Sequence, residues 1–279
     1  NRAIGGDLYP PGSTFKVITA AAALRLGKVT PDSQVDAPDT VTLPGTTHQL
    51  QNYAGESCGN GKVTLTYAFA ESCNTTFAQL AMNVGEQELT REAEAWGFNT
   101  SSSIPLTVTP SSFPSVKSQA ELAMAGIGQQ SVRVTPLQMA QIAATVANDG
   151  NQMQPYLVKR TLDDKLSVIS TTSPKVARSP ISSTVAGQLK TMMIQVVASG
   201  TGTSAQVDGM DVAGKTGTAE TGSDGGPVTW FIGYAGPSGQ APTIAIAVVL
   251  DGGDQTADTG TGGSEAAPIA ATVFKATQQ

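Results

Sequence analysis

The chain has 279 residues, a formal net charge of -6, 39% hydrophobic residues and 14% charged residues. This composition is typical of a globular protein with a sizeable core and excludes a disordered chain. No cluster of Lys and Arg indicates a nucleic-acid-binding surface, and no apolar run approaches the ~20 residues of a membrane-spanning helix.

Hydrophobic periodicity and the positions of Gly and Pro predict the elements of the chain. In chain order, we expect a helix over 13–26, irregular chain over 28–62 with short strands at 41–43 and 49–53, helices over 65–71, 75–84 and 86–96, a loop over 99–118, a short apolar segment over 119–125, a helix over 136–148, strands and a loop over 151–180, a helix over 182–198, strands over 207–218, 230–235 and 243–250, and a closing helix over 266–278.

Helices dominate the middle of this order and strands dominate its end. The pattern predicts an α+β fold, with an antiparallel sheet flanked by helices plus a mostly helical lobe. We expect the helical lobe over about 28–180, and the sheet lobe over about 181–279 together with the N-terminal residues.

The chain has two cysteines, Cys58 and Cys73, and one histidine, His48. The cysteines are either two independent buried thiols or one disulfide of an exported protein. In the chain-entropy picture, a disulfide would stabilise the fold by roughly 3 kcal/mol. One histidine and two cysteines cannot build a zinc site by themselves, so no metal or cofactor is expected.

A Ser-His-Asp triad would have to use His48, which we interpret as a surface residue of a Thr-rich loop. Lysine is the usual substitute base, and Ser13 and Lys16 lie three residues apart, on one face of a predicted helix. Lys16 can act as a base only if burial or a nearby cation lowers its pKa. Taken alone, the pair is equally well explained by a helix-capping serine and a solvated lysine.

Two further short patterns strengthen the case. Ser72-Cys73-Asn74 could simply satisfy backbone groups at a helix end, and Lys215-Thr216-Gly217-Thr218 could be an ordinary strand. In the functional interpretation, the missing side chain of Gly217 lets a substrate lie against that strand. Each pattern occurs once, and their order is that of β-lactamases and penicillin-binding proteins.

The chain therefore resembles the penicillin-binding protein transpeptidases, nearest the high-molecular-mass class B type and an actinobacterial member. The resemblance covers nearly the whole chain and implies one transpeptidase domain over 1–279 with a β-lactamase/transpeptidase-like fold. The matching segments are Pro11-Gly12-Ser13-Thr14-Phe15-Lys16, Glu71-Ser72-Cys73-Asn74-Thr75 with Phe77, Gly126-Ile127-Gly128-Gln129, Thr135-Pro136-Leu137-Gln138-Met139-Ala140, Ala147-Asn148-Asp149-Gly150, Gly214-Lys215-Thr216-Gly217-Thr218-Ala219, Trp230-Phe231-Ile232-Gly233-Tyr234, and Gly262-Gly263 with Ala266-Ala267-Pro268.

The resemblance implies a role for each motif. Ser13 would attack a D-Ala-D-Ala stem peptide and Lys16 would take its proton. Ser72, helped by Lys215, would relay a proton to the leaving D-Ala, and Asn74 would hold Lys16 and the substrate amide. The remaining implied groups are Lys215, Thr216, Gly217 and Thr218 for substrate binding and the backbone N–H groups of Ser13 and Thr218 for the oxyanion hole. A β-lactam would enter as a substrate mimic.

Two departures from the family pattern stand out. Only twelve residues precede Ser13, whereas the family places sheet strands there, so those strands, the N-terminal domain and the membrane anchor are expected outside this chain. The expected location is the extracytoplasmic face of the bacterial plasma membrane, with other cell-wall synthesis or division proteins as partners. The second departure is Cys73 inside the second motif, where a bond to Cys58 would steady the loop that carries Ser72.

Other functions stay open at this point. A β-lactamase needs a deacylating base, and no Glu-x-x-Leu-Asn run is present. A D,D-carboxypeptidase, a β-lactam sensor domain that acylates once, and a non-catalytic binding domain are the remaining alternatives.

Overall fold

A three-stranded antiparallel sheet forms one half of the molecule. The computed structural model describes residues 1–278 except 60, 103, 221–225 and 253–259. The sheet has the order β11-β10-β9, with β9 at Met210–Ala219, β10 at Val228–Pro237 and β11 at Ile244–Asp251. Its central strand, β10, is rich in aromatic and branched residues and is buried up to its last residue, as expected of a strand covered on both faces.

Helices make up most of the rest of the chain. They are α1 (Lys16–Arg25), α2 (Leu65–Ala70), α3 (Asn74–Val84), α4 (Glu86–Ala95), α5 (Gln119–Gly126), α6 (Pro136–Ala147), α7 (Ser183–Ala198) and α8 (Ala267–Ala276). Single turns lie at Gly12–Phe15 (η1), Tyr53–Gly55 (η2), Thr203–Ala205 (η3) and Gly262–Ala266 (η4, a π-turn).

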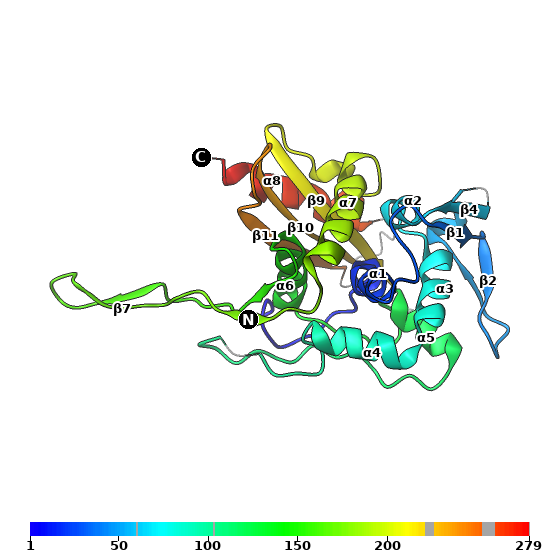
Figure 1. Cartoon of the computed structure of the whole chain (residues 1–279), viewed down its shortest axis with the longest axis horizontal. Coiled ribbons are helices and arrows are strands. Elements are labelled where there is room, and N and C mark those ends of the chain that lie inside the picture. The colour runs from blue at the N-terminus through cyan, green and yellow to red at the C-terminus, as the bar shows by residue number, and fades with distance from the viewer. Residues whose placement is uncertain (60, 103, 221–225, 253–259, 279) are drawn as a thin grey trace.

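The two faces of the sheet bury different helices. Alternate residues of a strand point to opposite faces: Phe231 and Ala235 of β10 join the apolar cluster of α8, whereas Trp230 and Ile232 join the larger cluster around α1. Helix α6 packs against β10 and β11, and α7 packs against β9. Figure 1 shows α8 behind the sheet, with α6, α7 and α1 in front of it.

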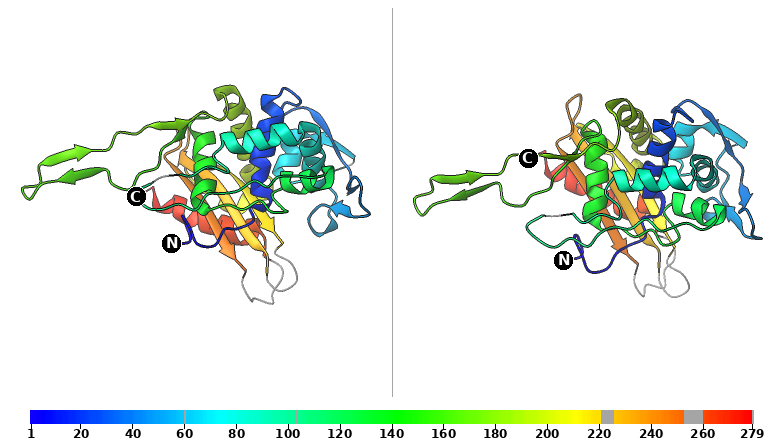
Figure 2. Two further views of the ribbon diagram at one scale, coloured as in Figure 1. Left: turned by 90° about the horizontal axis from the view of Figure 1, so that it is seen from below. Right: turned by 60° about the horizontal axis from the view of Figure 1, so that its bottom comes forward.

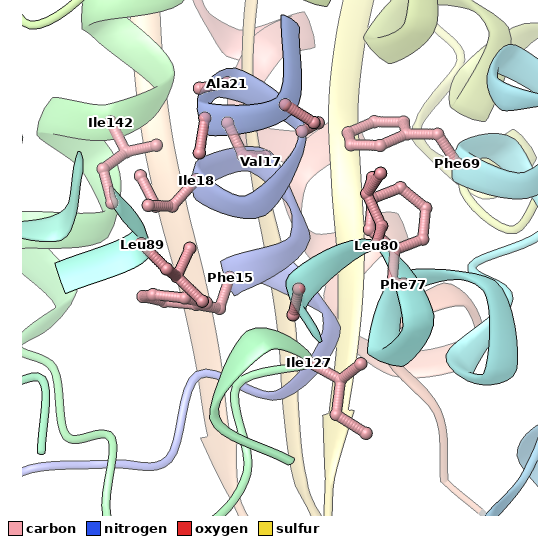
Figure 3. Packing of buried hydrophobic residues seen from close by; sticks show 14 of the residues in the cluster. Phe15, Val17, Ile18, Ala21, Phe69, Phe77, Leu80, Leu89, Ile127 and Ile142 are labelled. Atoms are coloured by element: carbon pink, nitrogen blue, oxygen red, sulfur yellow. The ribbon is translucent and has the colours of Figure 1, made fainter. Parts of the chain in front are cut away.

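Helix α1 runs through the centre of the larger core. The sequence predicts one apolar face, but every residue from Lys16 to Leu24 is buried. Four consecutive alanines make this possible, because their small side chains let neighbouring elements approach from all sides. Figure 3 shows Phe69 and Phe77 on one side of α1, and Leu89 and Ile142 on the other.

Short two-stranded sheets surround the helices. The additional strands are β1 (Gln34–Ala37) with β4 (Gly61–Thr64), β2 (Thr40–Thr42) with β3 (Gln49–Gln51), β5 (Gln152–Met153) with β8 (Val176–Arg178), and β6 (Arg160–Leu162) with β7 (Val168–Thr171). The sequence predicts β2 and β3 but describes β1 and β4 as irregular, since each strand alone is too short to show a period. The β6–β7 hairpin stands away from the body in every view (Figures 1 and 2).

The α+β architecture agrees with the predicted fold: an antiparallel sheet flanked by helices, next to a helix-rich part that contains α3, α4 and α5. Helix α6 packs on the sheet although the sequence places it in the helical lobe, and the division of the chain at about residue 180 stays a prediction. None of the helices in the described ranges combines the length and the apolarity that crossing a membrane requires.

Candidate active site

Ser13 lies in a tight turn directly before the central helix. The turn η1 begins at Gly12, whose φ of +52° favours glycine, and the Gly12 N–H donates to the carbonyl of Gly128 at 3.0 Å. A Cβ on Gly128 would lie 2.0 Å from the Gly12 oxygen, so the two glycines allow the backbones to meet. The turn that presents Ser13 is therefore fixed by backbone contacts, and it is followed by the start of α1.

The second motif occupies the turn between α2 and α3. Ser72 has a φ of +61°, a conformation that non-glycine residues rarely adopt and that is held here by its surroundings. The Cys73 N–H donates to the carbonyl of Ala68 at 2.9 Å, and Cys73 is joined to Cys58 by a disulfide with a Cα–Cα distance of 5.8 Å. Of the two alternatives that the sequence left open for the cysteines, the structure contains the disulfide.

Two lysines converge on Ser72. Lys16 Nζ lies 3.2 Å from Ser72 Oγ and donates to Asn74 Oδ1 at 2.7 Å and to the Ser72 carbonyl at 2.5 Å. From the opposite side, Lys215 Nζ lies 2.8 Å from the same hydroxyl and 3.1 Å from the carbonyl of Thr216. The Ser72 hydroxyl thus joins two amines that lie 199 positions apart in the sequence.

Burial changes the acid–base behaviour of both lysines. Lys16 and Lys215 are each 0% exposed. Burial, and then the charge of Lys215, lower the pKa of Lys16 well below its ordinary value, because an ammonium loses its hydration in the core. Burial also lowers the pKa of Lys215, to about 7, against the opposing charge of Glu71. Each amine lies 5.7 Å from an aromatic ring, Phe77 for Lys16 and Phe69 for Lys215.

The third motif lies on β9, the edge strand nearest the nucleophile turn. Thr216 and Thr201 share a hydrogen bond of 2.6 Å between their hydroxyls, and Thr218 Oγ1 accepts from the Gly262 N–H at 3.2 Å. A Cβ on Gly217 would meet the Pro11 carbonyl at 2.9 Å. The glycine therefore lets the nucleophile turn approach β9 closely, and the expectation that a substrate lies against this strand at Gly217 stays a prediction.

Ser13 opens into two adjoining cavities. The smaller cavity, of about 150 Å³, is lined by Ser13, Ser72, Asn74, Thr216, Gly217 and Thr218, together with residues that include Tyr53, Glu71 and Thr201. The larger cavity, of about 570 Å³, shares Ser13, Tyr53, Asn74 and Thr218 with the smaller one, and extends past His48 and Gln129. All three motifs therefore contribute to one cleft, and the exposed His48 lies at its margin.

Sequence reasoning missed several residues of this cleft. Thr201 and Tyr53 line it, and so does Glu71, which belongs to the second motif but has no role predicted from the sequence. Burial raises the pKa of Glu71, partly offset by Lys215. Thr201 lies in a Ser-Gly-Thr-Gly-Thr run with no periodic signal, so its place in the cleft and its contact with Thr216 are seen only in the structure. Within the described residues, no group of His, Cys, Asp and Glu could hold a metal ion.

Comparison with known proteins identifies the family to which the chain belongs. The family model "Penicillin binding protein transpeptidase domain" matches residues 2–275. The chain belongs to this family. The peptidoglycan D,D-transpeptidase PbpA of Mycolicibacterium smegmatis is 44% identical over 275 residues, and that of Mycobacterium tuberculosis is 43% identical over 286 residues. These alignments cover 96% and 100% of this chain.

Solved structures agree with this assignment. Penicillin-binding protein A of M. tuberculosis superposes with a TM-score of 0.90 at 42% identity, and its ceftriaxone acyl-enzyme complex with a TM-score of 0.92 at 42% identity. Both cover 100% of this chain, but 63% and 62% of the solved chains. The predicted resemblance to an actinobacterial penicillin-binding protein transpeptidase and the predicted β-lactamase/transpeptidase-like fold are confirmed. The chain spans 55% and 57% of the length of the two curated relatives.

Proposed function

We propose that this chain is a serine-type D,D-transpeptidase that cross-links peptidoglycan stem peptides through an acyl-enzyme on Ser13. The observation that carries the proposal is the Ser72 hydroxyl between two buried lysine amines, 3.2 Å from Lys16 Nζ and 2.8 Å from Lys215 Nζ, in the cleft that holds Ser13. A nucleophilic serine needs a neighbouring base, and a buried lysine with a lowered pKa can supply it.

The proposed reaction has two steps. In the first, Ser13 Oγ attacks the carbonyl carbon between the last two D-Ala residues, forms an ester and breaks the C–N bond. The proton of the Ser13 hydroxyl passes to Lys16 and, through Ser72, to the nitrogen of the leaving D-Ala. In the second step, an acceptor amine attacks the ester carbonyl carbon and forms the new peptide bond, the bond from that carbon to Ser13 Oγ breaks, and a proton from the amine returns to Ser13 Oγ.

The remaining motif residues would bind and orient the substrate. Asn74 holds Lys16 at 2.7 Å and lines both cavities, which supports a role in positioning the base and the substrate amide. Lys215, Thr216 and Thr218 would bind the substrate carboxylate along β9, with Gly217 between them. Backbone N–H groups of Ser13 and Thr218 would stabilise the oxyanion.

The same chemistry accounts for inhibition by β-lactams. Ser13 would attack the β-lactam carbonyl and form an ester, but the nitrogen released by ring opening would stay part of the acyl group, where a D-Ala would leave. The acyl-enzyme complexes of the M. tuberculosis relative with ceftriaxone and imipenem support this part of the proposal. The Cys58–Cys73 disulfide supports a location outside the cytoplasm, because disulfides persist in oxidising compartments. We place the enzyme at the extracytoplasmic face of the bacterial plasma membrane, held by a segment outside this chain, with other cell-wall proteins as partners.

The test is an acyl-transfer assay with a synthetic stem peptide ending in D-Ala-D-Ala and a fluorescent D-amino acid as the acceptor. The proposal predicts exchange of the terminal D-Ala for the acceptor, lost in Ser13→Ala and retained in the control Ser173→Ala, whose serine is exposed. Hydrolysed peptide at saturating acceptor would instead identify a carboxypeptidase. Release of one D-Ala per protein molecule without turnover would identify a sensor domain.

A further inference from the structure

A long hairpin carries much of the exposed apolar surface of the molecule. We call residues 153–176 the arm. It begins at the last residue of β5 and ends at the first residue of β8, which pair at its base, and β6 and β7 form its outer part. Nine of the fifteen exposed large hydrophobic side chains in the described chain belong to it. They are Met153, Tyr156, Leu157, Val158, Leu162, Leu166, Val168, Ile169 and Val176.

The arm has little support from the rest of the protein. In the described structure, β6 and β7 pair only with each other, and Figure 2 shows them projecting beyond the body. An isolated two-stranded hairpin is marginally stable in water, and a third strand adds both hydrogen bonds and apolar contacts. The outer edges of β6 and β7 offer backbone groups to such a strand, which natural proteins usually protect.

One face of the outer arm combines apolar side chains with a cation. Leu162 pairs with Val168 across the hairpin, next to a shift in the register, and alternation along β6 places Arg160 on the same face as Leu162. All three side chains are exposed. A strand added to either edge would lay every second side chain beside this face, so apolar residues at alternate positions, with a carboxylate at the one beside Arg160, would match it.

The charge of the arm is opposite to that of the whole chain. It contains four basic residues and two acidic ones, a net charge of +2, whereas the chain carries -6. One of the two carboxylates, that of Asp163, accepts the backbone N–H groups of Lys165 and Ser167 within the tip. Two arms would repel each other, and an acidic partner would be attracted.

The distribution of the apolar residues indicates an elongated partner. They extend from Met153 at the base to Leu166 at the tip, so a lipid surface would reach only the tip, where Asp163 and Asp164 lie. The edge strand β11 of a second copy would bring a single carboxylate, Asp251, in eight residues. Neither matches the whole arm.

We propose that the arm is a docking element for an acidic protein segment, which adds as an extended strand to an edge of the β6–β7 hairpin. Its apolar residues contact the Leu162–Val168 face, and two successive carboxylates, which point to opposite faces, lie beside Arg160 and Lys159. This interface is separate from the Ser13 cleft and does not depend on the reaction proposed for it.

The test uses a random dodecapeptide library displayed on phage. The library is selected on the whole chain and counter-selected on a variant in which Asn-Gly replaces residues 156–173, checked for folding by its cooperative thermal unfolding. We expect enriched peptides with net negative charge and alternating apolar residues, and slower hydrogen exchange of the β6 and β7 amides when they bind. No enrichment, or enrichment of neutral or basic peptides, would overturn the proposal.

Charge reversal separates electrostatic docking from general adhesion. Lys159→Glu with Arg160→Glu should weaken binding of the enriched peptide about tenfold, since two exposed ion pairs are replaced by repulsions. The control Lys28→Glu with Lys117→Glu makes the same change in net charge away from the arm and should alter affinity less than about twofold. Equal losses in both variants would contradict the proposal. So would arm-dependent sedimentation with phosphatidylglycerol vesicles, which would indicate a lipid surface, and an arm-dependent dimer in analytical ultracentrifugation, which would indicate a second copy.

Discussion

The rate at which penicillin acylates Ser13 should depend on pH through Lys215. The pKa of this buried amine is lowered to about 7, so it is charged below that pH and neutral above it. Its charged form contributes positive potential beside Ser72 and is one cause of the lowered pKa of Lys16. If acylation needs the charged form of Lys215, the rate constant falls as the pH rises through about 7.

The size of the effect follows from the titration. A group with a pKa of about 7 is about 90% protonated at pH 6 and about 10% protonated at pH 8, so the charged fraction of Lys215 falls about ninefold to tenfold over this range, and the alkaline limb of the rate constant follows it. Towards lower pH, the rate falls again as Lys16 takes up a proton and ceases to be a base. The resulting profile is bell-shaped, and its two limbs belong to the pair of amines.

The assay is the second-order rate constant for labelling by a fluorescent penicillin, measured between pH 5 and pH 9. In Lys215→Gln the alkaline limb should disappear, and the acid limb should move to higher pH because Lys16 loses the neighbouring cation that lowers its pKa. The control Lys175→Gln removes an exposed lysine and should keep the wild-type profile. A rate constant that does not fall on the alkaline side of its maximum, or an alkaline limb that persists in Lys215→Gln, would refute the reasoning.

Three further changes test the supports of the site, and a fourth, Gly45→Ala, is the control for Gly128→Ala. Gly128→Ala should lower the free energy of unfolding by about 2 to 4 kcal/mol in urea denaturation, because its Cβ would lie 2.0 Å from a backbone oxygen at a φ of +77°. Gly45→Ala, at a φ of +74° in open space, should cost about 1 kcal/mol. Thr201→Val should slow penicillin labelling about fivefold, because the third motif loses a hydrogen bond of about 1 kcal/mol. Reducing the Cys58–Cys73 disulfide should lower the free energy of unfolding by roughly 3 kcal/mol.

Each of these predictions has a clear contrary result. Equal losses in the two glycine variants would show that the close backbone contact at Gly128 contributes nothing. An unchanged labelling rate in Thr201→Val would show that the hydrogen bond between Thr201 and Thr216 does not contribute to acylation. A reduced protein with unchanged urea midpoint would show that the disulfide does not stabilise the fold.

Most of the secondary structure could be predicted from local sequence signals. Thr135 accepts the Gln138 N–H at the start of α6, with Pro136 in the first helical position, as its sequence predicts. Ser182 caps α7 in the same way. These elements depend on neighbouring residues, so a sequence window contains the information that defines them.

The site depends on contacts that no sequence window contains. Lys16 and Ser72 are 56 positions apart, and Ser72 and Lys215 are 143 positions apart. The order of the motifs predicted that these residues gather, but not that one hydroxyl would join both amines. The complete burial of α1, which lowers the pKa of Lys16, also depends on tertiary packing.

In the arm, the sequence predicts the strands but not how they are placed in the fold. Residues 151–180 predict strands and a loop, and the structure contains β5 to β8 there. Whether such strands join a sheet or stand alone is decided by the elements around them. Their isolation, and with it the exposed apolar face, is visible only in the folded molecule (Figures 1 and 2).

The central claim is that Ser13 is the acylated nucleophile of a cleft whose base is a buried lysine. The most direct test is intact-protein mass spectrometry after incubation with benzylpenicillin, followed by peptide mapping of the adduct. The account predicts one added benzylpenicillin per chain, located on Ser13 and absent from Ser13→Ala. An adduct on another residue, or one that persists in Ser13→Ala, would contradict it.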